Sequence, residues 1–421
     1  MSPANRLFPC PALVTIRSLI IRIQGILLKR PRRRPTSHTA AACPGVAFVL
    51  PHFEVGGIET GVLEYANALA NRGYAPSLIL SCRRGGLLSR LVDGVTVYDL
   101  GGRRALVTIP ALAKAIRLSR AEVVYSGTNA RNIATLLAVS LIPARVRPAV
   151  LISEHTSPGD YLSGARAPRL RRALMRRLYP RAQALLAPTE GLAEDWLSAL
   201  DLDRPRVMLQ PNPILGPAAL TMSERVATRT GPYRDPALIV AVGRFDPVKG
   251  HDLLIDAFAR LHRQYPWLRL VIYGDGAGRA ALETQIASAG LAQTVRLAGH
   301  TDDVAGALAR AAVLAVPSRR EGFGNVVIEA LAQGTPVVAT DCYGPASLLR
   351  RVGAAGRIVA CNDPAALAEG LAAILGDPAA RPVALSRGLS LARGYTVDAA
   401  VTQFVATARW AADQARGRPH R

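Results

Sequence analysis

Two basic residues lie close together in the stretch VGRFDPVKG, where Arg244 and Lys249 stand between an apolar run and a segment with helical periodicity. Arginine offers a planar fork of N–H donors and lysine a compact point charge, and both groups bind phosphate oxygens. The Asp246-Pro247 pair between them favours a turn that brings the two cations together. Lysine is scarce in this chain: only three of its 52 basic residues are lysines, and Lys249 is one of them. The stretch therefore predicts a clamp for a diphosphate, with a solvated loop as the alternative.

Two glutamates follow in the stretch SRREGFGNVVIEALAQGTPVV. Glu321 falls in a predicted loop, and Glu329 falls in a predicted helix that starts at Gly324-Asn325 and ends at Gly334. The apolar neighbours of Glu329 indicate a buried carboxylate, which is costly without a partner. A pair of sugar hydroxyls is a suitable partner, because a carboxylate accepts two hydrogen bonds in parallel. An ion pair with an arginine is the alternative interpretation.

Glycine-containing segments follow several of the predicted strands. The stretch PHFEVGGIETG places Gly56-Gly57 directly before a helix, where backbone N–H groups can approach an anionic ligand. A turn-forming glycine pair with no ligand is the alternative there. The segment Gly299-His300-Thr301 ends another strand, and its histidine is interpreted as a loop residue.

These residues are placed by elements whose pattern repeats along the chain. From residue 45 onward, short apolar or β-branched runs alternate with longer helical stretches, such as 59–72, 109–119 and 251–264. This alternation predicts parallel sheets with right-handed crossovers, in which ligands bind at the carboxyl ends of the strands. The predicted strands are 46–50, 76–81, 95–100, 122–126, 149–153 and 184–188, and then 238–242, 268–273, 294–297, 313–316, 337–340 and 357–359.

The two blocks of strands predict an α/β fold with two doubly wound, Rossmann-like domains that face each other across a cleft. Between the blocks, residues 211–235 are rich in Pro, Gly and polar residues, which indicates a linker. The predicted parts of the chain are an N-terminal extension (1–44), a first domain (45–215), a linker (216–236), a second domain (237–395), and a C-terminal helix that returns to the first domain, with a tail (396–421).

The composition limits the functions that the chain can have. Its formal charge is +22 and half of its residues are hydrophobic, so it can fill large cores and attract polyanions. The composition argues against a nucleic-acid partner, because aromatic residues make up only 5% of the chain and are not interleaved with basic ones. Five scattered cysteines favour a reduced, cytoplasmic protein. The basic clusters KRPRRR (29–34) and RLRRALMRR (169–177) indicate an anionic membrane surface or an anionic substrate, with solvated faces as the alternative.

The N-terminal segment 13–28 (LVTIRSLIIRIQGILL) is apolar but interrupted by polar residues, and KRPRRR follows it. A signal peptide carries its positive charges before the apolar core, so this order argues against one. The segment predicts an amphipathic helix at a membrane interface. The alternative is an extension that is disordered or that is not part of the native protein.

Taken together, VGRFDPVKGHDLLIDAF, Glu321-Gly-Phe-Gly, Glu329 after seven intervening residues and the GTPVVAT strand resemble the retaining glycosyltransferases of family 4. That family has the GT-B fold of two Rossmann-like domains, and the resemblance covers residues 46 to the C-terminus. It implies that Arg244 and Lys249 contact the diphosphate of a nucleotide-sugar donor. It further implies that Glu329 binds the ribose and that Glu321 contacts the donor sugar.

The resemblance also assigns expected roles to other positions. The turn at Gly56-Gly57 is expected to close over the phosphates and the acceptor. His155, in Ser153-Glu154-His155 at the end of a strand, matches a place where the family often has a sugar-contacting polar residue; a structural histidine is the alternative. The remaining expected substrate-binding residues are Gly322, Phe323, Gly324, Asn325, Gly299 and Thr301.

The implied reaction transfers a hexose with retention, by attack on the same face of the sugar from which the diphosphate leaves. No Asp-x-Asp motif lies in a suitable strand-end loop, and Asp201-Leu202-Asp203 is interpreted as a cap or turn, so no metal and no cofactor are expected. The chain departs from the family pattern Gly-Pro-x-Glu, because Ser347 stands where the acidic residue is common.

The implied partners are a nucleotide-sugar donor, with UDP favoured over GDP, and a lipid-linked or saccharide acceptor in envelope polysaccharide or glycolipid assembly. The expected location is the cytoplasm, with peripheral attachment to the inner face of the cell membrane as an extension. Two alternatives remain: a non-catalytic subunit that binds nucleotide sugars, and a nucleotide-sugar epimerase of the same fold.

Overall fold

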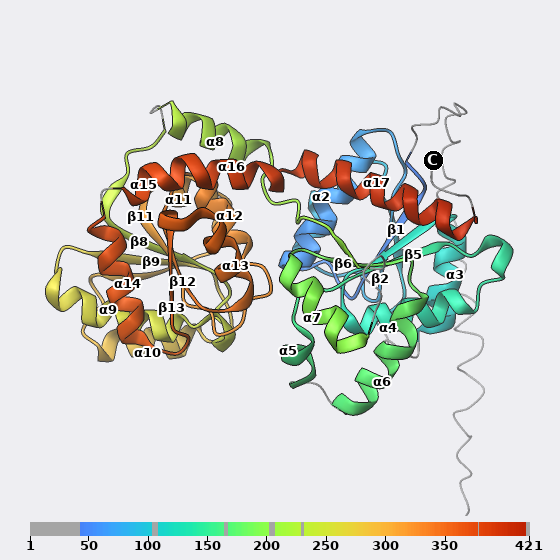
Figure 1. The fold of residues 1–421 in the computed structure, drawn as a ribbon, viewed down its shortest axis with the longest axis horizontal. Helices are drawn as coiled ribbons and strands as arrows, with labels where there is room; N and C mark the ends of the chain where they lie inside the picture. The colour runs from blue at the N-terminus through green and yellow to red at the C-terminus, as the bar shows by residue number, and fades with distance from the viewer. Residues whose placement is uncertain are drawn as a thin grey trace, which may run out of the picture. The chain divides into compact units, whose positions relative to one another are not determined.

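The computed structural model describes residues 43–102, 108–163, 167–201, 207–228, 231–377 and 379–417, which lie in one compact unit. These residues form two parallel β-sheets, each covered by helices (Figure 1). The predicted α/β fold with two doubly wound domains is confirmed. The extension predicted for residues 1–44, including its amphipathic helix and its KRPRRR cluster, lies outside the described residues except for Cys43 and Pro44.

The first sheet has seven strands in the order β3-β2-β1-β4-β5-β6-β7, and all neighbours are parallel. Its central strands are wholly buried, which explains their continuous apolar sequences such as VAFVL in β1. The strands are β1 (Val46–Leu50), β2 (Ser77–Leu80), β3 (Thr96–Asp99), β4 (Val123–Ser126), β5 (Ala149–Ser153), β6 (Ala184–Ala187) and β7 (Val207–Leu209).

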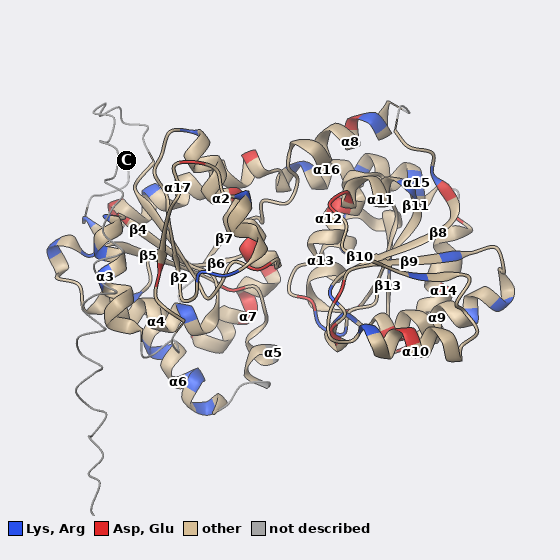
Figure 2. Cartoon of the chain, turned by 180° about the vertical axis from the view of Figure 1, so that it is seen from behind, with Lys and Arg blue, Asp and Glu red and all other residues tan. Residues whose placement is uncertain are grey.

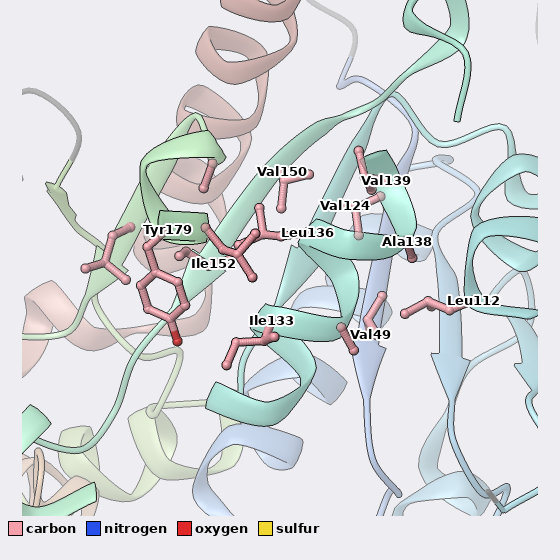
Figure 3. Close-up of a cluster of buried hydrophobic side chains, with 14 of the residues drawn as sticks. Val49, Leu112, Val124, Ile133, Leu136, Ala138, Val139, Val150, Ile152 and Tyr179 are labelled. Carbon is pink, nitrogen blue, oxygen red and sulfur yellow. The ribbon is translucent and has the colours of Figure 1, made fainter. Parts of the chain in front are cut away.

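Helices cover both faces of this sheet. One face is covered by α2 (Gly57–Asn71) and α17 (Val397–Ala415), whose Phe404 stacks on Tyr65 of α2 with ring centroids 4.7 Å apart. The opposite face carries a second apolar core, part of which Figure 3 shows, with side chains of the strands against Leu112 and Ile133. The helices on that face are α3 (Ile109–Ser119), α4 (Asn129–Ser140), α6 (Pro168–Leu178) and α7 (Glu190–Leu200), and α5 (Pro158–Ser163) precedes α6.

The second sheet has six strands in the order β10-β9-β8-β11-β12-β13, again all parallel. They are β8 (Asp235–Val242), β9 (Arg269–Tyr273), β10 (Val295–Gly299), β11 (Ala311–Val316), β12 (Val337–Thr340) and β13 (Gly356–Val359). One face is packed by α9 (His251–Gln264), α10 (Arg279–Ser288) and α14 (Pro364–Leu375). The other is packed by α11 (Val304–Arg310), α12 (Asn325–Ala332), α13 (Tyr343–Val352), α15 (Ala380–Val383) and α16 (Leu389–Ala392).

Short turns of helix complete the described chain: η1 (Gly86–Arg90), η2 (Ala144–Val146), η3 (Tyr179–Arg181), η5 (Pro247–Lys249), η6 (Gly353–Ala355), η7 (Ala384–Gly388) and η8 (Arg393–Tyr395). Two elements differ from the sequence expectation. Strand β7 was not predicted, and the stretch interpreted as a linker contains helix α8 (Pro217–Ala227), which packs on α11 and α12. No helix among the described residues is both long enough and apolar enough to cross a membrane.

The chain passes between the two sheets at two places that are joined to each other. Before α8, Leu215 pairs in parallel with Thr396, which is the N-cap residue of α17. The backbone N–H of Val397 donates to the carbonyl of Leu215 at 3.0 Å, and the N–H of Leu215 donates to Tyr395 at the same distance. The two connecting segments therefore lie side by side.

Candidate functional site

The turn after β8 is held in place by its own side chains and by a glycine. Asp246 accepts a hydrogen bond from the N–H of Val248 at 2.9 Å and caps η5, at whose end Lys249 lies. Gly250 has φ +68°, and a Cβ there would lie 2.0 Å from the carbonyl oxygen of Pro317. Only glycine fits both the left-handed backbone and this contact. The Lys249 turn is therefore packed directly against the loop that follows β11.

Arg244 lies at the start of the same turn and is exposed. The carbonyl of the preceding residue, Gly243, lies 3.3 Å from Nε2 of the buried His251. Burial lowers the pKa of His251 to about 4, so its ring is neutral and Nε2 can donate to that carbonyl. His251 therefore positions the backbone next to Arg244. From the sequence it was predicted only as the first residue of a helix.

Two ion pairs join the segment formed by η5 and α9 to the loop after β11. The segment contributes the basic residue of the first pair and the acidic residue of the second. The Lys249 ammonium pairs with the Glu321 carboxylate, and both side chains are mostly buried. One helical turn further, Asp252 receives two hydrogen bonds from the guanidinium of Arg319, at 2.8 and 2.6 Å. The hydrogen bonds from Arg319 lower the pKa of the Asp252 carboxyl and so favour its charged form.

Arg319 binds more than its acidic partner. Its Nη1 also donates to the carbonyl of Pro247 at 2.6 Å, and its Nε donates to the side chain of Asn362 at 2.9 Å. Its backbone N–H donates to Val248 at 2.8 Å. All three guanidinium nitrogens are therefore engaged, and they tie the turn that carries Lys249 to the loop that carries Glu321.

Helix α12 begins directly after that loop. Gly324 is its N-cap residue, with φ +91°, and Phe323 is buried against the ring of Tyr395. Glu329 lies one turn inside the helix and is half-buried, and it makes no hydrogen bond or ion pair with any described residue. Burial raises the pKa of the Glu329 carboxyl to about 7. The arginine partner that was the alternative interpretation is not found in the described part of the chain.

The N-terminus of α12 meets residues of the first domain. The side chain of Asn212 donates to Oδ1 of Asn325 at 3.0 Å. A Cβ on Gly57 would lie 3.7 Å from Nδ2 of Asn325, so the predicted glycine turn is next to this helix start. Gly56 is the N-cap residue of α2 and has extended backbone, and a Cβ there would lie 2.4 Å from a carboxylate oxygen of Glu59.

The loop after β5 brings His155 to the Glu321 loop. Its Nε2 lies 2.9 Å from the hydroxyl of Ser153, and burial lowers the pKa of His155 to about 4. A Cβ on Gly322 would lie 1.7 Å from the carbonyl oxygen of His155, so the two loops are in contact and Gly322 must be glycine. Among the described residues, the other ring nitrogen, Nδ1, has no hydrogen-bond partner.

A buried carboxyl anchors the same loop. Glu154 accepts hydrogen bonds from Asn132 at 2.9 Å, from Asn129 at 2.6 Å and from the hydroxyl of Tyr179. Burial nevertheless raises the pKa of Glu154 to about 8. The indole N–H of Trp196 donates to the carbonyl of the residue after His155 at 3.2 Å. These contacts fix both sides of His155.

The remaining predicted residues are less closely connected to this group. Gly299 ends β10 with φ +77°, and its carbonyl accepts from the N–H of Gly274 at 2.8 Å. The hydroxyl of Thr301 accepts from the N–H of Asp303 at 3.1 Å. No described contact links Gly299 or Thr301 to Lys249 or Glu321. Within the described residues there is also no group of three or more His, Cys, Asp or Glu side chains that could hold a metal ion.

Asp201, the first residue of the Asp-x-Asp sequence, is the C-cap of α7 with φ +53°, and the next two residues lie outside the described ones. Five residues of the group were not predicted as site residues from the sequence: Asp252, Arg319, Glu154, Glu59 and His251. Burial raises the pKa of the Glu59 carboxyl. The charges of His52 and Arg244 lower this pKa, but by less than burial raises it.

Comparison with known proteins identifies two family models along the chain. Residues 56–213 match the model described as "Glycosyl transferase 4-like domain". Residues 223–387 match the model described as "Glycosyl transferases group 1". The first match includes strands β2 to β7 of the seven-stranded sheet, and the second includes all strands of the six-stranded sheet.

Individual relatives are similar in sequence to this chain over parts of their length. The chain is 34% identical over 242 residues to an exopolysaccharide phosphotransferase of Streptomyces coelicolor, covering 57% of this chain and 24% of that protein. It is 29% identical over 251 residues to the N-acetylgalactosamine-N,N'-diacetylbacillosaminyl-diphospho-undecaprenol 4-alpha-N-acetylgalactosaminyltransferase of Campylobacter jejuni, covering 58% of this chain and 66% of that protein. The chain thus spans less than two thirds of either relative.

A solved structure extends the comparison to almost the whole described fold. The structure of Anabaena HepE in complex with UDP-glucose has a TM-score of 0.70 and 19% identity, with 87% of this chain and 100% of that chain covered. This similarity concerns the fold, which is GT-B. With both domain models matched in order, the chain belongs to the glycosyl transferases of group 1.

Proposed function

We propose that the protein transfers a hexose from a nucleotide-diphosphate sugar to an acceptor hydroxyl, with retention of anomeric configuration and without a metal ion. The observation that carries this proposal is the Glu329 carboxylate. It is half-buried, it makes no contact with a protein donor in the described chain, and burial raises its pKa to about 7. Such a group is costly unless a ligand supplies hydrogen-bond donors, and the two hydroxyls of a ribose would do so.

The ion pairs beside α12 suit the leaving group. Breaking the anomeric C–O bond places negative charge on the diphosphate, and preorganised positive groups stabilise it. Lys249 and Arg244 stand at the two ends of one turn, and the N-termini of α9 and α12 add partial positive charge. A diphosphate would compete with Glu321 for the Lys249 ammonium. Glu321 would then be released towards the donor sugar.

The acceptor side of the proposed site is formed by the first domain. The turn at Gly56-Gly57 and the loop that carries His155 both contact the second domain at the start of α12 or just before it. The acceptor oxygen would attack the anomeric carbon on the face from which the diphosphate leaves, and its proton would pass to the departing phosphate, so neither a protein nucleophile nor a protein base is required. His155 is neutral at physiological pH and would orient a sugar hydroxyl through Nδ1.

The proposed acceptor is a lipid-linked or growing saccharide of envelope polysaccharide or glycolipid, and the proposed location is the cytoplasmic side of a membrane, attached peripherally. The names of the two relatives support this class, because one concerns an exopolysaccharide and the other an undecaprenol-linked sugar. A uridine donor is proposed over a guanosine donor. Glu329 does not distinguish them, because both carry ribose.

A donor screen tests the proposal. We expect UDP-sugars to raise the Tm of the protein and radiolabel from one of them to appear in transferred or hydrolysed sugar, with EDTA having no effect. Binding without turnover, with every acceptor tried, would instead support a nucleotide-sugar-binding subunit. Conversion of the donor sugar to an epimer would support the epimerase. Loss of activity in EDTA with recovery on adding a divalent cation would contradict metal independence.

The Arg319–Asp252 pair yields a separate prediction. We expect Arg319→Ala and Asp252→Ala each to lower kcat/KM about tenfold, because the turn that carries Lys249 loses a support, and the double variant to be no worse than either single one. Steady-state kinetics with a fixed acceptor measures this coupling. The matched control is the Arg269–Asp235 pair, which joins the amino ends of β8 and β9, at the other edge of the sheet from the Lys249 turn. If replacement of that pair by alanines costs as much activity, the effect of Arg319 is one of general stability.

A further inference from the structure

One face of the first domain combines positive charge with exposed apolar side chains. Helices α3, α4 and α6 cover that face of the sheet, and α4 contacts both of the others. The segments 109–120, 129–147 and 168–181, which contain these helices, carry twelve Lys and Arg and no Asp or Glu. Figure 2 shows basic residues on both α3 and α6.

Helix α6 shows the clearest pattern. Leu170 and Leu174 lie one turn apart and are 61% and 36% exposed. Arg177, three residues after Leu174, is exposed beside it, and Arg172 and Arg176, also one turn apart, are exposed further round the same helix. The same helix buries Met175 and Leu178 in the core, so its exposed leucines are not part of the packing that holds the helix.

The neighbouring segments repeat this combination. Exposed large apolar residues occur at Leu118 near the end of α3, at Leu141 just after α4 and at Val146 in η2. Leu118 directly follows the exposed Arg117, Val146 lies between the exposed Arg145 and Arg147, and Leu141 lies four residues before Arg145. We name the exposed residues of α3, of 141–147 and of α6 the basic-apolar surface.

From this surface we infer that the first domain docks on a membrane that contains anionic lipids, with α6 lying in the headgroup region. Arginines attract the anionic headgroups, and exposed leucines gain free energy by leaving water at the acyl boundary. A nucleic acid fits less well, because the only aromatic residue in the three segments, Tyr179, is 2% exposed and offers no stacking platform. An anionic polysaccharide would use the arginines and leave the leucines in water.

The inference deepens the peripheral location proposed above and rests on it, but its test needs no turnover. The full-length protein is sedimented with vesicles of phosphatidylcholine alone and with vesicles that also contain phosphatidylglycerol. We expect binding only to the anionic vesicles, and binding that weakens as salt is raised.

Matched variants assign the binding to α6. We expect Arg172→Gln with Arg176→Gln, and separately Leu170→Gln with Leu174→Gln, to weaken vesicle binding about tenfold or more. The control is Arg260→Gln with Arg263→Gln on α9 of the other domain, which removes the same charge from exposed positions. Transfer to a water-soluble acceptor should be unchanged in all three double variants, because none of these residues belongs to the proposed site.

Three results would overturn the inference. The first is equal binding to neutral and anionic vesicles. The second is an equal loss of binding in the α6 and α9 arginine variants, which would make the effect one of net charge. The third is full binding by both α6 variants together with loss of binding when the KRPRRR run at 29–34 is replaced by glutamines, which would place the anchor in the N-terminal extension.

Discussion

Lys249→Ala is expected to lower kcat/KM for the nucleotide sugar about 100-fold or more while the fold is retained. In the proposed reaction the ammonium stabilises charge that develops on the diphosphate, and loss of one preorganised donor of this kind costs roughly 100- to 1000-fold in other enzymes. Lys249 lies at the end of η5, whose backbone is held by Asp246, Gly250 and Arg319, so removal of the side chain leaves the turn supported. Steady-state kinetics measures the loss in kcat/KM, and thermal unfolding measures whether the fold is retained.

Two controls sharpen this experiment. Lys249→Arg keeps the charge but replaces a compact ammonium by a broader fork, and we expect it to recover only part of the rate. Arg269→Ala removes one partner of an ion pair elsewhere in the same domain and should leave kcat/KM within about twofold. Wild-type turnover in Lys249→Ala, at unchanged Tm, would remove this residue from the proposed diphosphate clamp.

Glu329→Gln is expected to raise the KM for the donor about tenfold and, at alkaline pH, to make the unliganded protein more stable. The KM rises because a charged acceptor is replaced by a neutral amide with a single acceptor oxygen, whereas hydrogen bonds to charged groups are the stronger ones. Donor titrations at several pH values should also show the wild-type KM rising as pH falls below about 7, since the carboxyl then becomes protonated.

The stability effect has a definite sign. Burial raises the pKa of the Glu329 carboxyl to about 7 from 4.5, so the folded protein binds this proton more tightly than the unfolded chain does. The folded state therefore loses stability as pH rises from about 4.5 through 7, by on the order of 3 kcal/mol when the group is fully ionised.

Thermal unfolding at pH 5 and pH 8 measures this effect, because the Tm difference between Glu329→Gln and wild type should grow between the two values. Glu369→Gln, at an exposed position on α14, controls for the change in net charge. A Tm difference that stays the same at both pH values would show that Glu329 carries no such penalty.

The elements that carry the site were predictable because their signals are local. Apolar runs such as VAFVL alternate with helical segments, and the structure places strands at all twelve predicted positions, with shifts of up to three residues at their ends. The exception among strands, β7, has only three residues and is not fully buried, so its sequence VML shows no period. Helix α8 was missed because Pro217 opens it within a Pro- and Gly-rich stretch.

The pairing of charges was not predictable in the same way. Arg319 and Asp252 are 67 residues apart, and nothing in either local sequence indicates that they meet. They come together because β8 and β11 are neighbours in the sheet, which brings the segments after the two strands to the same edge. Glu154 was passed over for a related reason. Its partners Asn129 and Asn132 belong to a different crossover, and only the fold brings them to one carboxyl.

Helix α17 has a consequence for how the chain can be divided. Its Phe404 completes the aromatic cluster with Phe48, Tyr65 and Tyr125 on one face of the seven-stranded sheet. The domain that begins at β1 is therefore not contiguous in sequence, and its last structural part is synthesised after the whole six-stranded domain. A fragment that ends before residue 397 would expose this aromatic face to water, and a separately supplied α17 peptide would be needed to cover it. During synthesis the first domain thus cannot be completed until the second has left the ribosome.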